Sequence, residues 1–135
     1  VEMKTFSIGE LARATGVATQ TIRYYEQQGL MPAPQRTQAN YRRYPEEAVA
    51  RLQFIVHAKQ WGFNLEEVRE LLLLQDANGD RAQAKRIAGE KLARIREQIQ
   101  NLRRVEAVLA KTYGECSGTG SVAGCPIVDA IAEQP

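Results

Sequence analysis

The feature that most constrains this chain is a long stretch, from about residue 82 to residue 111, whose apolar residues form one narrow stripe. As a single helix the stretch would be about 45 Å long at 1.5 Å per residue. The stripe keeps a heptad register, and Arg, Glu, Gln and Lys occupy most of the remaining positions. We expect a second copy of the chain to cover it in a homodimer; packing against the N-terminal part of the same chain is the alternative. The stripe consists of Leu92, Ile95, Ile99, Leu102 and Leu109.

The first thirty residues predict two short helices separated by a tight turn. Ser7 and Glu10 have the spacing of a capping box, so a first helix should begin there and end near Gly16. A second helix is expected over residues 18–28, before Gly29. Two short helices joined by a turn that contains glycine form a helix-turn-helix pattern.

The segment after these helices predicts a hairpin-like wing. Pro32 and Pro34 exclude a helix at its start. Asn40 offers a turn, and residues 41–44 alternate aromatic and basic side chains as a short strand would.

Two more helices should follow. Pro45 is expected to open a third helix that ends at Gly62, and Asn64 with Glu67 should cap a fourth. We therefore expect a mainly α-helical chain in four parts. These are a winged helix-turn-helix DNA-binding domain (residues 5–75), a linker (76–81), a dimerisation helix (82–112), and a cysteine-containing effector loop (113–135) that ends in a short apolar segment (126–132).

Charge and residue type point to DNA as a partner, although charge alone does not decide the question. Residues 1–60 hold eight Lys and Arg against five acidic residues, a bias that suits a polyanion but also an ordinary solvated surface. A recognition helix places the side chains near its N-terminus in the major groove, and basic groups hold phosphates. If the chain does not bind DNA, Ile22 and either Tyr24 or Tyr25 belong to the core, and the arginines are simply solvated. The candidate DNA-binding residues are Thr19, Gln20, Arg23 and Tyr24 on the second helix, and Arg36, Tyr41, Arg42 and Arg43 on the wing.

Several segments match one known family in order and spacing. They are residues 7–12, 16–17, 21–30, 41–44 and 61–68, and the C-terminal pattern Cys116…Cys125-Pro126-Ile127. Through these segments the chain resembles the MerR family of transcriptional regulators over nearly its whole length, and through its cysteines the metal-responsive branch of that family.

The resemblance implies roles for particular residues. Arg23 and Tyr24 would anchor the second helix on phosphates, and Arg42 and Arg43 would do the same from the wing. The long helix would form an antiparallel coiled coil between two protomers. Family members act on promoters whose spacer is too long, and they distort the double-stranded DNA so that RNA polymerase can engage; the promoter expected here controls metal resistance or efflux.

Cys116 and Cys125 are the candidate ligands of an effector ion. They are separated by a loop rich in glycine, which can fold so that both sulfurs reach one ion. Thiolates prefer soft metal ions, here Cu(I), Ag(I), Au(I), Hg(II), Cd(II), Pb(II) or Zn(II). Sensing of oxidation or electrophiles by the same two thiols is the alternative function, and an inert pair is a third possibility.

The resemblance bears on which ion is bound. Divalent sensors of the family supply a further cysteine from the partner subunit near the start of the long helix, where residues 78–82 of this chain contain none. Monovalent sensors have a serine there and often a shorter cysteine loop. Two thiolates alone suit a two-coordinate soft ion, whereas a divalent ion would need Asp80, a carbonyl or water as well.

We expect the bound ion to order the loop between the two cysteines. The ordered loop would pack residues 126–132 against the long helix and reorient the two DNA-binding domains of the dimer.

Other classes of protein are disfavoured. No apolar run approaches the roughly 18–20 residues that span a bilayer, and residues 1–7 do not read as a signal peptide, so the cytoplasm is the expected location. The sequence shows no phosphate-binding loop or nucleophile motif, and His57 reads as a structural or surface residue, so no enzyme is expected. The remaining alternatives are a drug-responsive regulator, disfavoured by the short tail, and a coiled-coil interaction protein whose basic wing is incidental.

Overall fold

The computed structural model describes residues 4–32, 34–39 and 41–133, and the chain divides into two compact units, residues 1–85 and residues 86–135. Asn40, where the sequence predicts the turn of the wing, lies outside the described residues.

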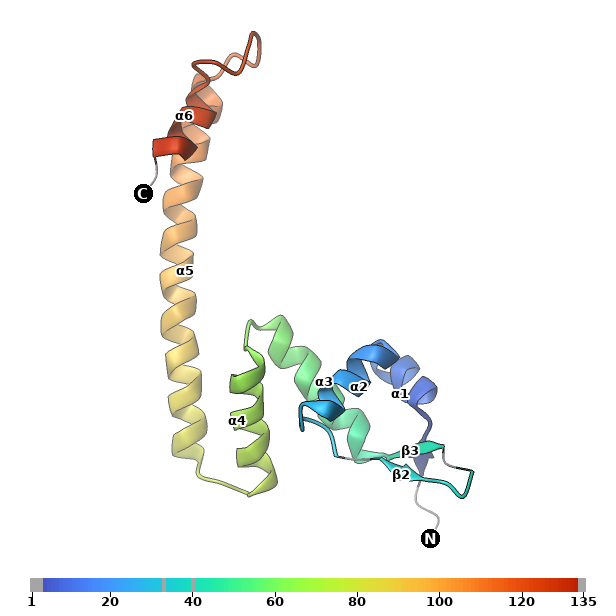
Figure 1. Ribbon diagram of the computed structural model, residues 1–135. Coiled ribbons are helices and arrows are strands. Elements are labelled where there is room, and N and C mark those ends of the chain that lie inside the picture. Colours follow the sequence, from blue (N-terminus) through green and yellow to red (C-terminus); the bar gives the residue numbers. More distant parts are fainter. Residues whose placement is uncertain (1–3, 33, 40, 134–135) are drawn as a thin grey trace. The chain divides into compact units, whose positions relative to one another are not determined.

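The helix-turn-helix is present as predicted (Figure 1). Helix α1 spans Ile8–Thr15 and helix α2 spans Thr19–Gln27. The Ser7 hydroxyl accepts a hydrogen bond from the Glu10 amide at 3.1 Å, and the Glu10 carboxylate accepts one from the Ser7 amide at 3.0 Å. Gly16 ends α1 with φ of 75°, a left-handed conformation that glycine adopts without steric cost.

Helices α3 (Glu47–Gln60) and α4 (Leu65–Asp76) follow in the first unit. The capping box of Asn64 and Glu67 is confirmed, with hydrogen bonds of 2.8 and 3.0 Å. The prediction that Pro45 opens α3 is wrong, because Pro45 is the last residue of a strand and pairs with Thr5.

A small antiparallel sheet forms the wing. Strand β3 (Arg42–Pro45) lies between β1 (Thr5–Phe6) and β2 (Gln35–Arg36), and its register pairs Tyr44 with Phe6 and Arg42 with Arg36. The hairpin of β2 and β3 agrees with the sequence-based expectation, whereas β1 was not anticipated.

One hydrophobic core holds the helices and the wing of the first unit together. Leu11 of α1, Ile22 of α2 and Tyr44 of β3 are fully buried in it. The helix-turn-helix and the wing therefore share one support, which fixes where their exposed side chains lie. The other members are Val17, Leu30, Met31, Ala48, Leu52, Ile55, Ala58, Val68 and Leu72.

A short, tightly folded linker joins α4 to helix α5, which spans Arg81–Glu115. Asn78 adopts a left-handed conformation with φ of 49°, and the Gly79 amide donates to the Leu74 carbonyl at 2.8 Å. A Cβ atom on Gly79 would lie 2.8 Å from a Leu74 methyl carbon, so a larger residue here would make the Leu74 side chain shift. At its other end α5 passes through Gly114, which we expected to lie in a loop.

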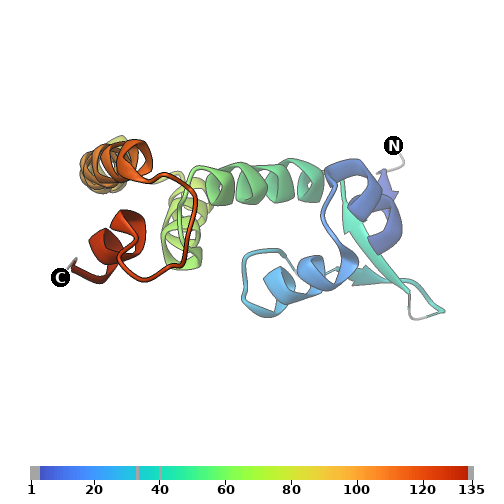
Figure 2. The ribbon, with the colours of Figure 1, turned by 90° about the horizontal axis from the view of Figure 1, so that it is seen from above.

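In the second unit, helix α6 (Pro126–Glu133) lies beside the C-terminal part of α5 (Figures 1 and 2). The predicted apolar segment at residues 126–132 is thus a helix. Thr112 is buried in this unit and its hydroxyl donates to the Val108 carbonyl at 2.9 Å. No helix among the described residues is long and apolar enough to cross a membrane.

Candidate nucleic-acid interface and thiol site

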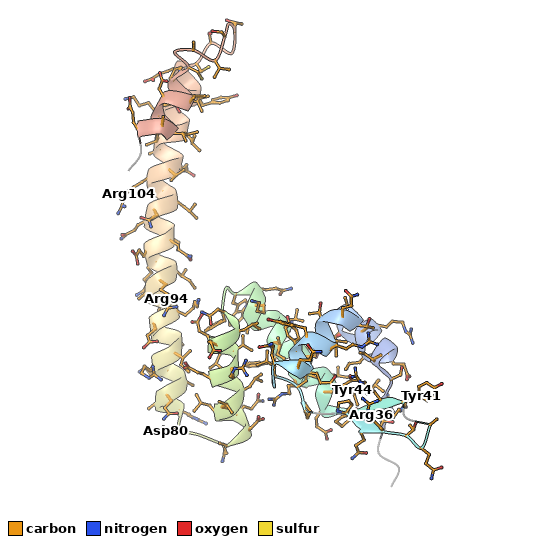
Figure 3. All side chains as sticks on the ribbon, viewed as in Figure 1. Arg36, Tyr41, Tyr44, Asp80, Arg94 and Arg104 are labelled. Carbon is orange, nitrogen blue, oxygen red and sulfur yellow. The ribbon has the colours of Figure 1, made fainter. Side chains whose placement is uncertain are left out.

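A hollow of about 690 Å³ on the first unit is lined by all four of the predicted DNA-binding arginines, and we call it the basic hollow. Helix α1 contributes to one wall, α2 to another, and the wing to the rest. Figure 3 shows Arg36, Tyr41 and Tyr44 at the wing. Four guanidinium groups around one open depression form a surface suited to phosphate oxygens. The lining residues are Ser7, Ile8, Arg23, Arg36, Thr37, Tyr41, Arg42 and Arg43.

The predicted residues of α2 differ in where they lie. Arg23 lines the basic hollow, whereas Thr19, Gln20 and Tyr24 do not. Gln20, Arg23 and Tyr24 are exposed, as contacts with base edges or backbone require, and Thr19 is half-buried. Helix α2 begins after Ala18, which has no side chain that can cap the first amides. The free amides of such a helix end favour an anion.

Arg43 makes contacts inside the domain that the sequence did not reveal. Its Nε donates to the Thr5 hydroxyl and its Nη2 to the Thr5 carbonyl, both at 3.1 Å. Its Nη1 lies 3.5 Å from the carboxylate of Glu10, the same group that caps α1. Arg43 therefore ties the wing to β1 and to the start of α1, as well as facing the basic hollow.

Tyr44 ties the wing to the other end of α2. Its side chain is fully buried, and its hydroxyl donates to the Glu26 carboxylate at 2.8 Å. Burial and this hydrogen bond raise the pKa of the Tyr44 phenol to about 12. The wing and the recognition helix are thus held together by a neutral phenol at any physiological pH.

The thiol site lies at the end of α5. Cys116 directly follows α5, and its sulfur accepts a hydrogen bond from the Gly118 amide at 3.4 Å. Cys125 directly precedes α6, and Gly124 before it has φ of 77°. Both cysteines are free and half-buried, and the Cys116 side chain is near enough to Cys125 to contribute to lowering the pKa of its thiol. The structure thus brings together the two thiols that the sequence singled out.

The surroundings of Cys125 favour its thiolate form. The pKa of the Cys125 thiol is lowered mainly by hydrogen bonds from the backbone amides of Val128 and Ile127, and further by the Cys116 side chain; partial burial and Asp129 oppose the shift. Amides at the N-terminus of a helix commonly activate a cysteine in this way. Cys125 is therefore prepared for a reaction or for a soft ion.

The donor set offers two sulfur ligands in one chain. Among the described residues no group of three or more His, Cys, Asp or Glu side chains is placed to hold a metal ion. Asp80 lies at the turn between α4 and α5 (Figure 3), where its carboxylate accepts a hydrogen bond from the Ala82 amide at 2.9 Å. His57 is exposed on α3. Two thiolates fit a soft ion of linear coordination; a higher coordination number requires donors from outside this set.

Two protein-family models match the chain. Residues 6–75 match the model described as "MerR HTH family regulatory protein", and residues 49–112 match the model "MerR, DNA binding". The first covers the helices and wing that form the basic hollow, and the second extends along α5.

Curated relatives match almost end to end. The chain is 35% identical over 129 residues to the mercuric resistance operon regulatory protein of Serratia marcescens, with 96% of this chain and 89% of the relative covered. It is 38% identical over 131 residues to the HTH-type transcriptional regulator ZntR of Escherichia coli K12, with 95% and 93% covered.

Solved structures show the same architecture. The regulator PbrR691 of Ralstonia metallidurans in complex with lead(II) superposes with a TM-score of 0.78 at 30% identity, covering 93% of this chain and 98% of that one. MerR of Bacillus megaterium in complex with mercury(II) gives a TM-score of 0.61 at 30% identity, covering 92% and 96%.

Proposed function

The chain belongs to the MerR family of DNA-binding regulatory proteins, and we propose that it is a homodimeric, cytoplasmic transcription regulator that senses a soft metal ion. In this proposal the winged helix-turn-helix binds double-stranded promoter DNA. Cys116 and Cys125 hold the ion. The bound ion then changes the shape of the promoter, so that RNA polymerase transcribes metal-resistance or efflux genes.

The basic hollow supports the assignment of DNA contacts. Arg36, Tyr41 and Arg42 of the wing would hold phosphates on one side of the hollow, together with Arg43, and Arg23 and Tyr24 would hold them from α2. Gln20 is exposed near the N-terminus of α2, and it and Thr19 would face the bases of the major groove.

The exposed stripe of α5 supports the dimer. Leu92, Ile99, Leu102 and Leu109 are all exposed in the single chain, with 67% of Leu102 accessible to solvent. A row of apolar side chains at heptad spacing is covered when two such helices pair. The two DNA-binding heads would then be joined through one long element.

The single observation that carries metal sensing is the thiol pair between the end of α5 and the start of α6. The curated relatives and neighbours that span nearly the whole chain are named for mercury and lead. Two thiolates in one chain suit a two-coordinate ion such as Cu(I), Ag(I) or Au(I). A divalent ion, Hg(II), Cd(II), Pb(II) or Zn(II), would need Asp80, a carbonyl or water to complete a three- or four-coordinate shell.

The test is to load the reduced protein with each soft ion in turn, under competition with a chelator, and to measure the retained metal and the promoter affinity. We expect one ion per thiol pair. The double variant with Cys116→Ser and Cys125→Ser should bind no ion, keep its affinity for the promoter, and lose the transcriptional response. Serine variants that lose DNA affinity as well, or a response to oxidants that requires both thiols without any retained metal, would contradict metal sensing. The second result would favour a redox sensor.

A further inference from the structure

The C-terminal end of α2 is held by an arginine that also binds the last residue of α4. Arg51 of α3 donates from Nε to the carbonyl of Leu30, three residues beyond α2, at 2.6 Å. Its Nη1 and Nη2 donate to the two carboxylate oxygens of Asp76 at 2.7 and 3.1 Å. We call this chain of contacts from Leu30 through Arg51 to Asp76 the Arg51 bridge.

Both ends of the Arg51 bridge are fixed. Leu30 is buried in the core, and its amide donates to the Tyr25 carbonyl of α2 at 2.9 Å. Asp76 ends α4, and the pKa of its carboxyl is lowered mainly by the hydrogen bonds from Arg51. A bidentate pair between a guanidinium and a carboxylate restricts direction as well as distance.

The linker beyond Asp76 is short and tightly folded. Four residues separate α4 from α5. The Ala77 amide donates to the Leu73 carbonyl at 3.0 Å, the Gly79 amide is bonded to Leu74, and the Asp80 carboxylate caps the first turn of α5. The start of α5 is therefore connected to Asp76 by a segment whose backbone is hydrogen-bonded back onto α4.

We propose that Arg51 and Asp76 are positioning residues that fix the orientation of the recognition helix α2 relative to the start of α5. In a dimer joined through α5, this restricts the two heads to one separation and one rotation on DNA. The same connection carries a displacement of α5 to α2. The inference rests on the dimeric DNA-binding part of the proposed function and does not depend on metal sensing.

The chain contains a matched control for the Arg51 bridge. Arg69 of α4 also donates to a carbonyl at the C-terminal end of α2, that of Gln28, and it lies 3.7 Å from the carboxylate of Glu66. Glu66, however, is in the first turn of α4, at the end opposite the linker. Removal of Glu66 therefore removes the acidic partner of a comparable arginine without touching the connection to α5.

The experiment measures how binding depends on the distance between half-sites. A symmetric duplex is selected for tightest binding to the unmodified protein, and base pairs are then inserted or removed between its halves. Each base pair shifts one half-site by about 3.4 Å and turns it by about 35°. Affinities are measured for the unmodified protein and for Asp76→Ala, Asp76→Asn and Glu66→Ala.

We expect Asp76→Ala to weaken the preference for the selected spacing about fivefold or more, since about fivefold is the lower end of the coupling commonly found between two sites. Asp76→Asn should weaken the preference less. Glu66→Ala should keep the preference of the unmodified protein. A purely structural role of Asp76 would lower affinity equally at every spacing, and that result would overturn the proposal. If Asp76→Ala does not fold, an unchanged preference in Asp76→Asn overturns it. An unmodified protein without any spacing preference overturns the dimeric function together with this inference.

Discussion

At the scale of the residue, Cys125 shows how the backbone can prepare a side chain for chemistry. The amides of Ile127 and Val128 at the start of α6 donate to its sulfur. These groups have no partner within the helix, and they stabilise negative charge. The backbone amides at the N-terminus of α6, and not a lysine or arginine side chain, therefore account for most of the lowering of the Cys125 pKa.

This arrangement predicts the pH dependence of alkylation. The pKa of Cys125 is lower in the folded chain than its ordinary value, so its thiolate forms at lower pH when the chain is folded. The folded chain and the chain unfolded in urea are each alkylated with iodoacetamide over a range of pH, and the modified Cys125 peptide is measured by mass spectrometry. The pH midpoint of the reaction should be lower for the folded chain. The urea sample is the control. Equal midpoints would show that the amides of α6 do not act on this sulfur.

Side-chain pairs show which residue contacts a sequence can and cannot reveal. The pairs Ser7–Glu10 and Asn64–Glu67 are three residues apart, so the capping rule predicts them correctly. The bond from Tyr44 to Glu26 joins residues 18 apart, and the contacts of Arg43 with Thr5 join residues 38 apart. Such pairs depend on how the elements fold together. The chemistry of Cys116 and Cys125 was visible from residue type, but the hydrogen bonds that favour the Cys125 thiolate were not.

At the scale of the element, the wing arginines line one hollow, and Arg43 among them also holds the wing to its neighbours. Arg36 of β2 lines the basic hollow, and its side chain is exposed. Arg43 of β3 also lines the hollow, but it holds the wing to β1 and to the first turn of α1. Both are placed for a phosphate contact, and Arg43 also maintains the shape of the surface through its contacts with Thr5 and Glu10.

The salt dependence of DNA binding, measured beside the stability of the fold, can separate a phosphate contact from structural support. Loss of one phosphate contact reduces the slope of log affinity against log salt by about 1. We expect both Arg36→Gln and Arg43→Gln to show that reduction, and Arg43→Gln also to lower the free energy of unfolding because it removes the contacts with Thr5 and Glu10. Arg96→Gln, on α5, is the control and should change neither. A slope unaltered by Arg36→Gln would remove Arg36 from the interface.

Element boundaries were predictable where a local signal exists. Glycine ends α1, and asparagine begins α4, as expected. Strand β1 was missed because two residues carry no periodicity, and only pairing with β3 defines it. The same pairing makes Pro45 the end of a strand, although its position before two glutamates is also typical of a helix start. Gly114 continues α5 because the preceding turns of the helix outweigh the modest cost of one glycine.

At the scale of the whole molecule, the family architecture depends on a helix that the single chain leaves partly uncovered. The apolar stripe of α5 runs from Leu92 to Leu109, and five exposed large apolar side chains lie on α5 over this length. Exposed apolar residues at heptad spacing are costly to leave in water and are the ordinary basis of helix pairing. Dimerisation through this stripe would therefore bring two DNA-binding heads onto one duplex.

One substitution in the stripe tests this directly. Ile99→Glu places a charge in the middle of the proposed seam, where burial without a partner is strongly unfavourable, so we expect the chain to become monomeric at micromolar concentration. Because one head alone makes half of the contacts, affinity for a symmetric duplex should fall by well over tenfold. The mass is measured by sedimentation, and the affinity by titration of a labelled duplex. Ala93→Glu adds the same charge at an exposed position of α5 outside the stripe, and it should remain dimeric. If Ile99→Glu is also dimeric and binds the duplex normally, α5 does not pair through this stripe, and another surface must join the two heads.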